Sequence, residues 1–121
     1  MPTVVVVDDT PGVARMVARI LNREGYDVVS LHDGLHLIET IRETRPALVL
    51  LDLSLPYKDG WTLIREVRDT ADLAELPVIA LSGHCSDDDI AKVRGSGYTD
   101  FVSKPFPLTE LRNKVEQYAA V

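Results

Sequence analysis

An unbroken apolar run, from Ala47 to Leu51, leads directly into the carboxylate of Asp52, and Pro56 ends the segment four residues later. A run without polar alternation predicts a strand that is covered on both faces, as strands are in a parallel sheet. In open α/β folds, the carboxyl ends of parallel strands carry the binding and catalytic groups. Asp52 lies at such an end, so the rest of the chain must supply two covering layers and neighbours for this carboxylate.

Four further segments have the composition of strands, which gives five strands at residues 4–7, 27–32, 47–52, 78–81 and 98–103. The second strand is less apolar than the others and favours an edge position. Helical spacing of apolar residues is found in residues 13–21, 37–41, 63–67 and 108–118, and N-cap candidates at 86–89 begin a further helix that ends at Gly95. We expect Thr10 to cap the first helix through its hydroxyl, and residues 70–76 to be a loop.

Alternating strands and helices with short, right-handed connections predict an α/β fold, a single doubly wound parallel sheet with five helices on its two faces. A five-stranded sheet of this kind commonly has the strand order 2-1-3-4-5. That order places the second strand at an edge, in agreement with its composition. It also makes the first and third strands neighbours, so that the residues after residue 7 lie beside Asp52.

The composition limits the functions that this chain can have. Its 121 residues are enough for one domain with a hydrophobic core. The net charge of −6 argues against direct binding to nucleic acid, because phosphate contacts need clustered Lys and Arg. No apolar run reaches the roughly 18 residues of a membrane span. A single cysteine, Cys85, and a start without the features of a secretory signal favour a cytoplasmic location.

Polar residues end or follow four of the five strands at the same edge of the expected sheet. They are Asp8 and Asp9, Asp52, Ser82 and Lys104. Crowded carboxylates repel one another unless a cation joins them, and Mg²⁺ binds through a few carboxylates while leaving room for a phosphate oxygen. The charges of three carboxylates, one Mg²⁺ and one ammonium cancel. Such a site could accept a phosphoryl group on Asp52, with Lys104 and Ser82 holding phosphoryl oxygens.

In these motifs and spacings the chain resembles the receiver domain of two-component response regulators. The matching motifs are Asp8-Asp9, the segment from Asp52 to Gly60, Ser82-Gly83 and Lys104-Pro105-Phe106. The resemblance covers nearly the whole chain and implies a flavodoxin-like receiver domain over residues 1–121. It implies a phosphorylation-dependent switch, which catalyses only its own phosphotransfer and dephosphorylation and is not an enzyme in the usual sense.

The resemblance implies that Asp52 receives its phosphoryl group from a phosphohistidine on a sensor histidine kinase or a histidine phosphotransfer protein. Asp9 and Asp52 would bind Mg²⁺ directly and Asp8 directly or through water, with the backbone carbonyl of Ser54 as a further ligand. The family also tends to have a cis peptide bond at the position of Lys104–Pro105, and an X-Pro bond makes that form accessible.

Four residues would act in switching or in the lifetime of the phosphoryl group. Ser82 takes a hydroxyl position that is often Thr, and Phe101 takes an aromatic switch position that is often Tyr. Ser54 and His84 would flank the path of the hydrolytic water. We hypothesise that His84 alters dephosphorylation; an ordinary exposed loop histidine is the alternative.

The output is expected to run through the face formed by the fourth helix, the fifth strand and the fifth helix. The target of this output would be a downstream protein or an output domain outside this chain, with no nucleic acid or membrane as a direct partner. A phosphorylation-independent adaptor with the same fold is the alternative, although a degenerate receiver usually lacks one of the five polar residues. A hydrolase of the haloacid dehalogenase type would need a second Asp where this chain has Ser54.

Overall fold

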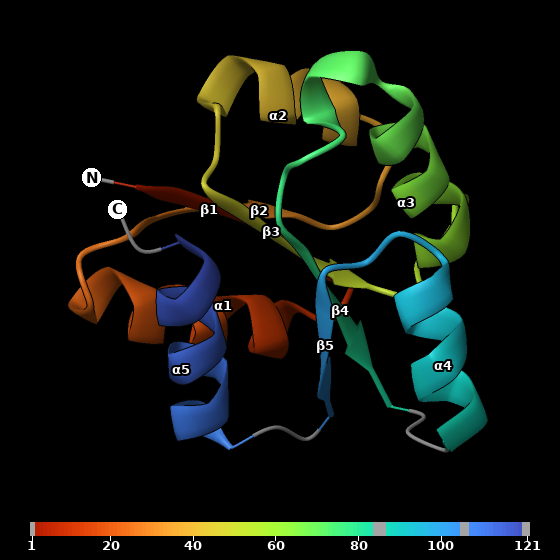
Figure 1. Ribbon diagram of the computed structural model, residues 1–121. Helices are drawn as coiled ribbons and strands as arrows, with labels where there is room; N and C mark the ends of the chain where they lie inside the picture. The colour runs from red at the N-terminus through yellow and green to blue at the C-terminus, as the bar shows by residue number, and fades with distance from the viewer. Residues whose placement is uncertain (1, 84–86, 105–106, 120–121) are drawn as a thin grey trace.

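A parallel sheet of five strands forms the middle layer of the protein, and helices cover both of its faces (Figure 1). The computed structural model describes residues 2–83, 87–104 and 107–119. The strands are β1 (Thr3–Val7), β2 (Asp27–Leu31), β3 (Leu48–Asp52), β4 (Val78–Ser82) and β5 (Asp100–Ser103). Their order is β2-β1-β3-β4-β5, and each neighbouring pair is parallel, so the predicted topology is confirmed.

The helices divide between the two faces of the sheet (Figure 1). The helices α1 (Pro11–Arg23) and α5 (Leu108–Ala119) cover one face, and α2 (Leu37–Thr44), α3 (Gly60–Asp69) and α4 (Asp87–Gly95) cover the other. None of the helices in the described ranges has the length and apolar character that crossing a membrane requires.

Strand β3 lies in the centre of the sheet, and all five of its residues are buried. Leu48 and Leu50 pack in the core under α1 and α5, whereas Val49 and Leu51 pack in the core under α2, α3 and α4. Because successive side chains of a strand point to opposite faces, a strand buried on both faces needs an unbroken apolar sequence. Strand β2, at the edge, is only half-buried, as its composition predicted.

The start of β5 differs from the prediction, because the strand begins at Asp100 and not at Tyr98. The N–H of Thr99 donates to the carbonyl of Val78 at 2.8 Å, and Thr99 Oγ1 accepts from the N–H of Val78 at 3.1 Å. The hydroxyl of Thr99 therefore replaces a backbone partner at this end of the sheet. Regular pairing starts one residue later, with Asp100 opposite Ile79.

The predicted hydroxyl cap of α1 is wrong. The carbonyl of Thr10 accepts hydrogen bonds from the N–H groups of Val13 and Ala14, but its side chain makes no capping bond. The N–H of Thr10 instead donates to Asp8 Oδ1 at 2.8 Å. The start of α1 thus orients a carboxylate at the end of β1.

The segment of residues 70–76, predicted as a loop, contains a short 3-10 helix, η1 (Ala71–Leu73). The guanidinium of Arg68 fixes this segment, because Nη1 donates to the carbonyl oxygens of Leu73 at 3.2 Å and Leu76 at 2.7 Å. Its Nε donates to the carbonyl of Gly97 at 2.7 Å. One arginine therefore joins the segment before β4 to the segment before β5.

Candidate functional site: a carboxylate cluster at the sheet edge

Three carboxylates meet at the carboxyl ends of β1 and β3. Asp8 and Asp9 follow β1, Asp52 ends β3, and these strands are hydrogen-bonded neighbours. Each residue offers a carboxylate oxygen, and the three oxygens lie within 4.8 Å of one another. Asp8 is fully buried and Asp52 is 5% exposed, whereas Asp9 is exposed. Two carboxylates of the cluster, those of Asp8 and Asp52, are therefore buried, and the carboxylate of Asp9 faces solvent.

The ammonium of Lys104 connects the two buried carboxylates. Its Nζ donates to Asp8 Oδ2 at 2.7 Å and to Asp52 Oδ2 at 3.0 Å. The backbone N–H of Lys104 donates to the carbonyl of Ser82 at 2.6 Å, which fixes the lysine at the end of β4. The remaining oxygen of Asp52, Oδ1, accepts from the N–H of Ser54 at 3.0 Å. The site thus joins the ends of β1, β3, β4 and β5.

Burial and charge act in opposite directions on the two groups that titrate at the centre of the site. Burial raises the pKa of Asp52, and the charge of Asp8 adds to this, although hydrogen bonds from Ser54 and Lys104 oppose it. Burial alone would lower the pKa of Lys104, but hydrogen bonds to Asp8 and Asp52 outweigh it and raise that pKa. Lys104 is therefore a permanent cation at neutral pH, since an ordinary lysine has a pKa of about 10.4.

This donor set fits a divalent cation. Three carboxylates and one ammonium have a formal charge of −2, which one divalent ion would balance. Mg²⁺ prefers oxygen ligands and keeps several waters, so one exposed and two buried carboxylates suit it. The N–H of Ser54 places this residue beside Asp52. That the carbonyl of Ser54 is a further ligand stays a prediction.

Ser82 lies at the same sheet edge, one strand away from the acid cluster. It ends β4 and is 6% exposed, and the preceding residue, Leu81, pairs with Asp52 in the sheet register. A hollow of about 170 Å³ lies at this point, and its lining consists of Leu53, Ser54, Trp61, Ser82, Asp89 and Lys92. The hollow therefore brings together the residues that follow Asp52 and the side chain that ends β4.

The other predicted site residues lie farther from the cluster or outside the described part of the chain. Phe101 is on β5, half-buried, and packs against the core under α2, α3 and α4. His84 lies outside the described residues, so its role in dephosphorylation stays a prediction. The same holds for a cis bond between Lys104 and Pro105.

Three side chains near the hollow were not singled out in the sequence. Lys92 Nζ lies 4.5 Å from the centroid of the Trp61 indole, a cation–π contact. Trp61 meets Tyr98 edge to face, with ring centroids 6.3 Å apart. The hydroxyl of Tyr98 donates to the carbonyl of Gly60 at 2.7 Å. Trp61 directly follows the Asp59-Gly60 turn in the sequence, and this position could have marked it as a residue near the site.

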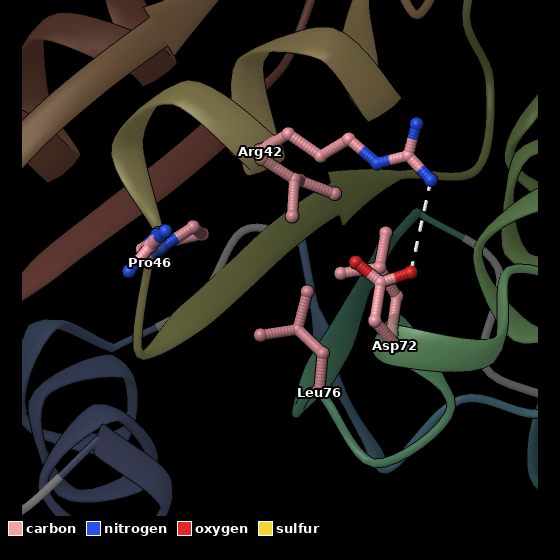
Figure 2. A pocket seen from close by; sticks show the side chains of 7 residues that line it. Arg42, Pro46, Asp72 and Leu76 are labelled. Atoms are coloured by element: carbon pink, nitrogen blue, oxygen red, sulfur yellow. Dashed lines mark ion pairs between the residues drawn. The ribbon is translucent and has the colours of Figure 1, made fainter.

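A larger hollow of about 500 Å³ lies at the opposite, amino end of the strands (Figure 2). Its lining consists of Ile41, Arg42, Arg45, Pro46, Asp72, Leu73 and Leu76. An ion pair of 3.7 Å between Arg42 and Asp72 links α2 to η1 across it, as Figure 2 shows. The length of a five-residue strand, about 16 Å, separates the two ends of the sheet. This hollow is therefore not part of the carboxylate site.

Comparison with known proteins gives one consistent result. Residues 4–116 match the family model of the response regulator receiver domain. The BeF3-activated N-terminal receiver domain of RstA from Klebsiella pneumoniae is 31% identical, with a TM-score of 0.89 over 98% of this chain and 99% of that one. A candidate response regulator from Chloroflexus aurantiacus is 30% identical, with a TM-score of 0.92 over 100% of both chains.

A third similar structure is the receiver domain of the Francisella response regulator 1452, which is 28% identical with a TM-score of 0.91 over 98% of this chain and 97% of that one. The family match covers almost the entire length, and the strand order and the acid cluster of this chain agree with it. The chain belongs to the family of response regulator receiver domains.

Proposed function

We propose that this chain is a phosphorylation-dependent switch of a two-component or phosphorelay system, with Asp52 as the phosphoacceptor. The observation that carries the proposal is the Lys104 ammonium, which joins two buried carboxylates at the carboxyl edge of the sheet. A cation held beside a buried acid, with a second cation site next to it, favours attack on an anionic phosphoryl group.

Asp52 is the nucleophile in this proposal. One of its carboxylate oxygens attacks the phosphorus of a phosphohistidine on a sensor kinase or a phosphotransfer protein. The new O–P bond forms as the N–P bond breaks, and the imidazole leaves with the electron pair and takes up a proton. Asp52 then holds the phosphoryl group as an aspartyl phosphate until water hydrolyses it.

Asp8, Asp9, Asp52 and the carbonyl of Ser54 would hold Mg²⁺. Bound there, Mg²⁺ supplies charge neutralisation for the phosphoryl oxygens. The ammonium of Lys104 would hold a second phosphoryl oxygen. It already contacts Asp52 Oδ2 at 3.0 Å, so a short movement brings it to the transferred group.

Ser82 and Phe101 would convert phosphorylation into a change of surface. The Ser82 hydroxyl would move toward the phosphoryl group, and Phe101 would follow inward from its half-buried position. The surface that changes is the face of α4, β5 and α5. A phenylalanine has no hydroxyl to offer to a partner, so only the position of its ring can report the state of Asp52. Ser54 and His84 would set the lifetime of the phosphoryl group.

We propose that residues 1–121 are one receiver domain that works in the cytoplasm. Its input would be a histidine kinase or a phosphotransfer protein, and its output a protein or an output domain, without direct contact to nucleic acid or membrane. The net charge of −6 supports the expected lack of contact with nucleic acid. A phosphorylation-independent adaptor is the alternative; it would have the same fold but would not accept a phosphoryl group on Asp52.

The test uses beryllofluoride, an acyl-phosphate mimic, with Mg²⁺. Thermal unfolding is followed with Mg²⁺ alone and with both together, for the wild type and for Asp52→Asn. We expect beryllofluoride to raise the unfolding temperature of the wild type and to leave that of Asp52→Asn unchanged. A wild type that responds to neither beryllofluoride nor acetyl phosphate would contradict the proposal and favour the adaptor.

A further inference from the structure

The loop of residues 53–59 joins the acceptor strand β3 to α3, and its position sets the surroundings of Asp52. At its start, the N–H of Ser54 donates to Asp52 Oδ1 at 3.0 Å. At its end, the N–H of Gly60 donates to the carbonyl of Leu53 at 3.0 Å, which closes the loop at its base. Any group that fixes Gly60 therefore also fixes the residues that contact Asp52.

Tyr98 supplies such a group from a distant part of the sequence. Its side chain is buried, 5% exposed, and its hydroxyl donates to the carbonyl of Gly60 at 2.7 Å. Burial, with the charges of Asp59 and Asp52, raises the pKa of Tyr98, so the hydroxyl keeps the proton that it donates. Its ring lies edge to face against Trp61, which holds it in this orientation.

The packing around Gly60 leaves no room for a side chain. A Cβ at this position would lie 2.7 Å from the Tyr98 hydroxyl and 2.7 Å from the Cα of Leu53. The loop and the tyrosine hydroxyl therefore approach one another as closely as a glycine permits. A phenylalanine would fill the same space in the core, so Tyr98→Phe would remove the bond to Gly60 and keep the packing of the ring.

We propose that Tyr98 is a positioning residue for phosphoryl transfer at Asp52. Its hydrogen bond to Gly60 holds the loop of residues 53–59 in the position from which the N–H of Ser54 contacts Asp52 and its carbonyl would hold Mg²⁺. This inference rests on the proposed function of Asp52. Tyr98 contacts Gly60 and Trp61, so it would act through the loop and not directly on the phosphoryl group or the metal.

The test compares Tyr98→Phe with Tyr118→Phe, a matched control. Tyr118 also donates one hydrogen bond through its hydroxyl, to Asp100 Oδ2 at 2.8 Å, and lies on α5, away from Asp52. The first readout needs no metal: amide hydrogen exchange at Ser54 and Gly60. We expect exchange there to be about threefold to tenfold faster in Tyr98→Phe, the effect of losing one neutral hydrogen bond. Tyr118→Phe should leave both amides unchanged.

The second readout is the dissociation constant for Mg²⁺. We expect it to rise about threefold to tenfold in Tyr98→Phe only. Phosphorylation by acetyl phosphate should slow at low Mg²⁺ and recover at high Mg²⁺, which a general loss of stability would not produce.

Equal loop exchange and equal Mg²⁺ affinity in Tyr98→Phe and the wild type would overturn the inference, even if the variant unfolds more easily. A slower phosphorylation that excess Mg²⁺ does not restore would also contradict it. If the wild type itself fails to take up a phosphoryl group, the proposed function of Asp52 fails instead, and the exchange data still decide whether Tyr98 holds the loop.

Discussion

Replacing Lys104 with methionine tests the electrostatics of the site, because methionine has a similar length and no charge. The ammonium lies 2.7 Å from Asp8 Oδ2 and 3.0 Å from Asp52 Oδ2. The carboxylate side chains are 0% and 7% exposed, and the lysine side chain is 22% exposed. Lys104→Met therefore leaves two buried carboxylates without the donor that they share.

The loss of stability follows from this burial. Removing one partner of a buried ion pair costs about 3–5 kcal/mol, and since Lys104 is partly exposed we expect the lower end, about 3 kcal/mol, without metal at pH 7. Burial alone would lower the pKa of Lys104, but its hydrogen bonds to Asp8 and Asp52 raise it. Because the pKa of Lys104 is higher in the folded than in the unfolded protein, this lysine stabilises the fold at any pH below its unfolded pKa, near 10.4. The contribution disappears as the pH rises through its pKa in the folded protein.

The assay is urea unfolding of metal-free protein between pH 4 and pH 8. Burial holds the pKa of Asp52 above its ordinary value, and loss of the Lys104 ammonium would raise it further, so the variant takes up a proton at Asp52 as the pH falls. The destabilisation by Lys104→Met should be largest at neutral pH and should shrink toward pH 4. Lys58→Met is the control, because Lys58 pairs with Glu66 at 2.8 Å but the two side chains are 42% and 35% exposed. That control should lose about 1 kcal/mol or less. Equal losses in the two variants, or a loss that does not change with pH, would refute the reasoning.

Two further predictions concern other parts of the chain. Burial alone would raise the pKa of Asp100, but hydrogen bonds from Lys114, from the N–H of Phe101 and from Tyr118 lower it. Asp100→Asn should therefore lose about 1–3 kcal/mol at pH 7. Urea unfolding should show this difference begin to shrink below about pH 4, where the unfolded carboxyl takes up its proton, and vanish only as the pH falls through the lower pKa of the folded carboxyl; a difference that does not shrink over this range would contradict the assignment. Trp61 is the single tryptophan and lines the hollow with Ser54 and Ser82, so Mg²⁺ with beryllofluoride should change its fluorescence in the wild type and not in Asp52→Asn. An equal change in both proteins would show that the emission does not report on Asp52.

The sequence predicted the parts of the site that follow from strand order. The run into Asp52 required a strand buried on both faces, and β3 is such a strand. The order of the strands then placed Asp8 and Asp9 next to Asp52, and the structure brings their oxygens within 4.8 Å of one another. Lys104 was predicted at the same edge, and its contacts with Asp8 and Asp52 agree with that position.

The parts that the sequence could not predict depend on contacts between distant segments. The bond from Tyr98 to Gly60 joins residues 38 positions apart, and no local pattern encodes it. The start of β5 depends on the side chain of Thr99, which replaces a backbone partner. Thr10 is a residue type that favours the N-cap position, but its side chain makes no capping bond, and its backbone N–H donates to the carboxylate of Asp8. For Tyr98 and Thr99 the deciding hydrogen bond joins distant segments, whereas the bond between Thr10 and Asp8 is local.

The most direct measurement of the central claim is phosphoryl transfer to Asp52 itself. Three proteins are incubated with Mg²⁺ and a histidine kinase labelled on its phosphohistidine: the wild type, Asp52→Asn and the control Asp33→Asn. Asp33 is suitable as the control because its carboxylate lies in a turn, where it accepts from the N–H of Leu35. We predict label on the wild type and on Asp33→Asn, and none on Asp52→Asn. Labelling of Asp52→Asn at the level of the wild type would contradict the assignment of Asp52 as the phosphoacceptor.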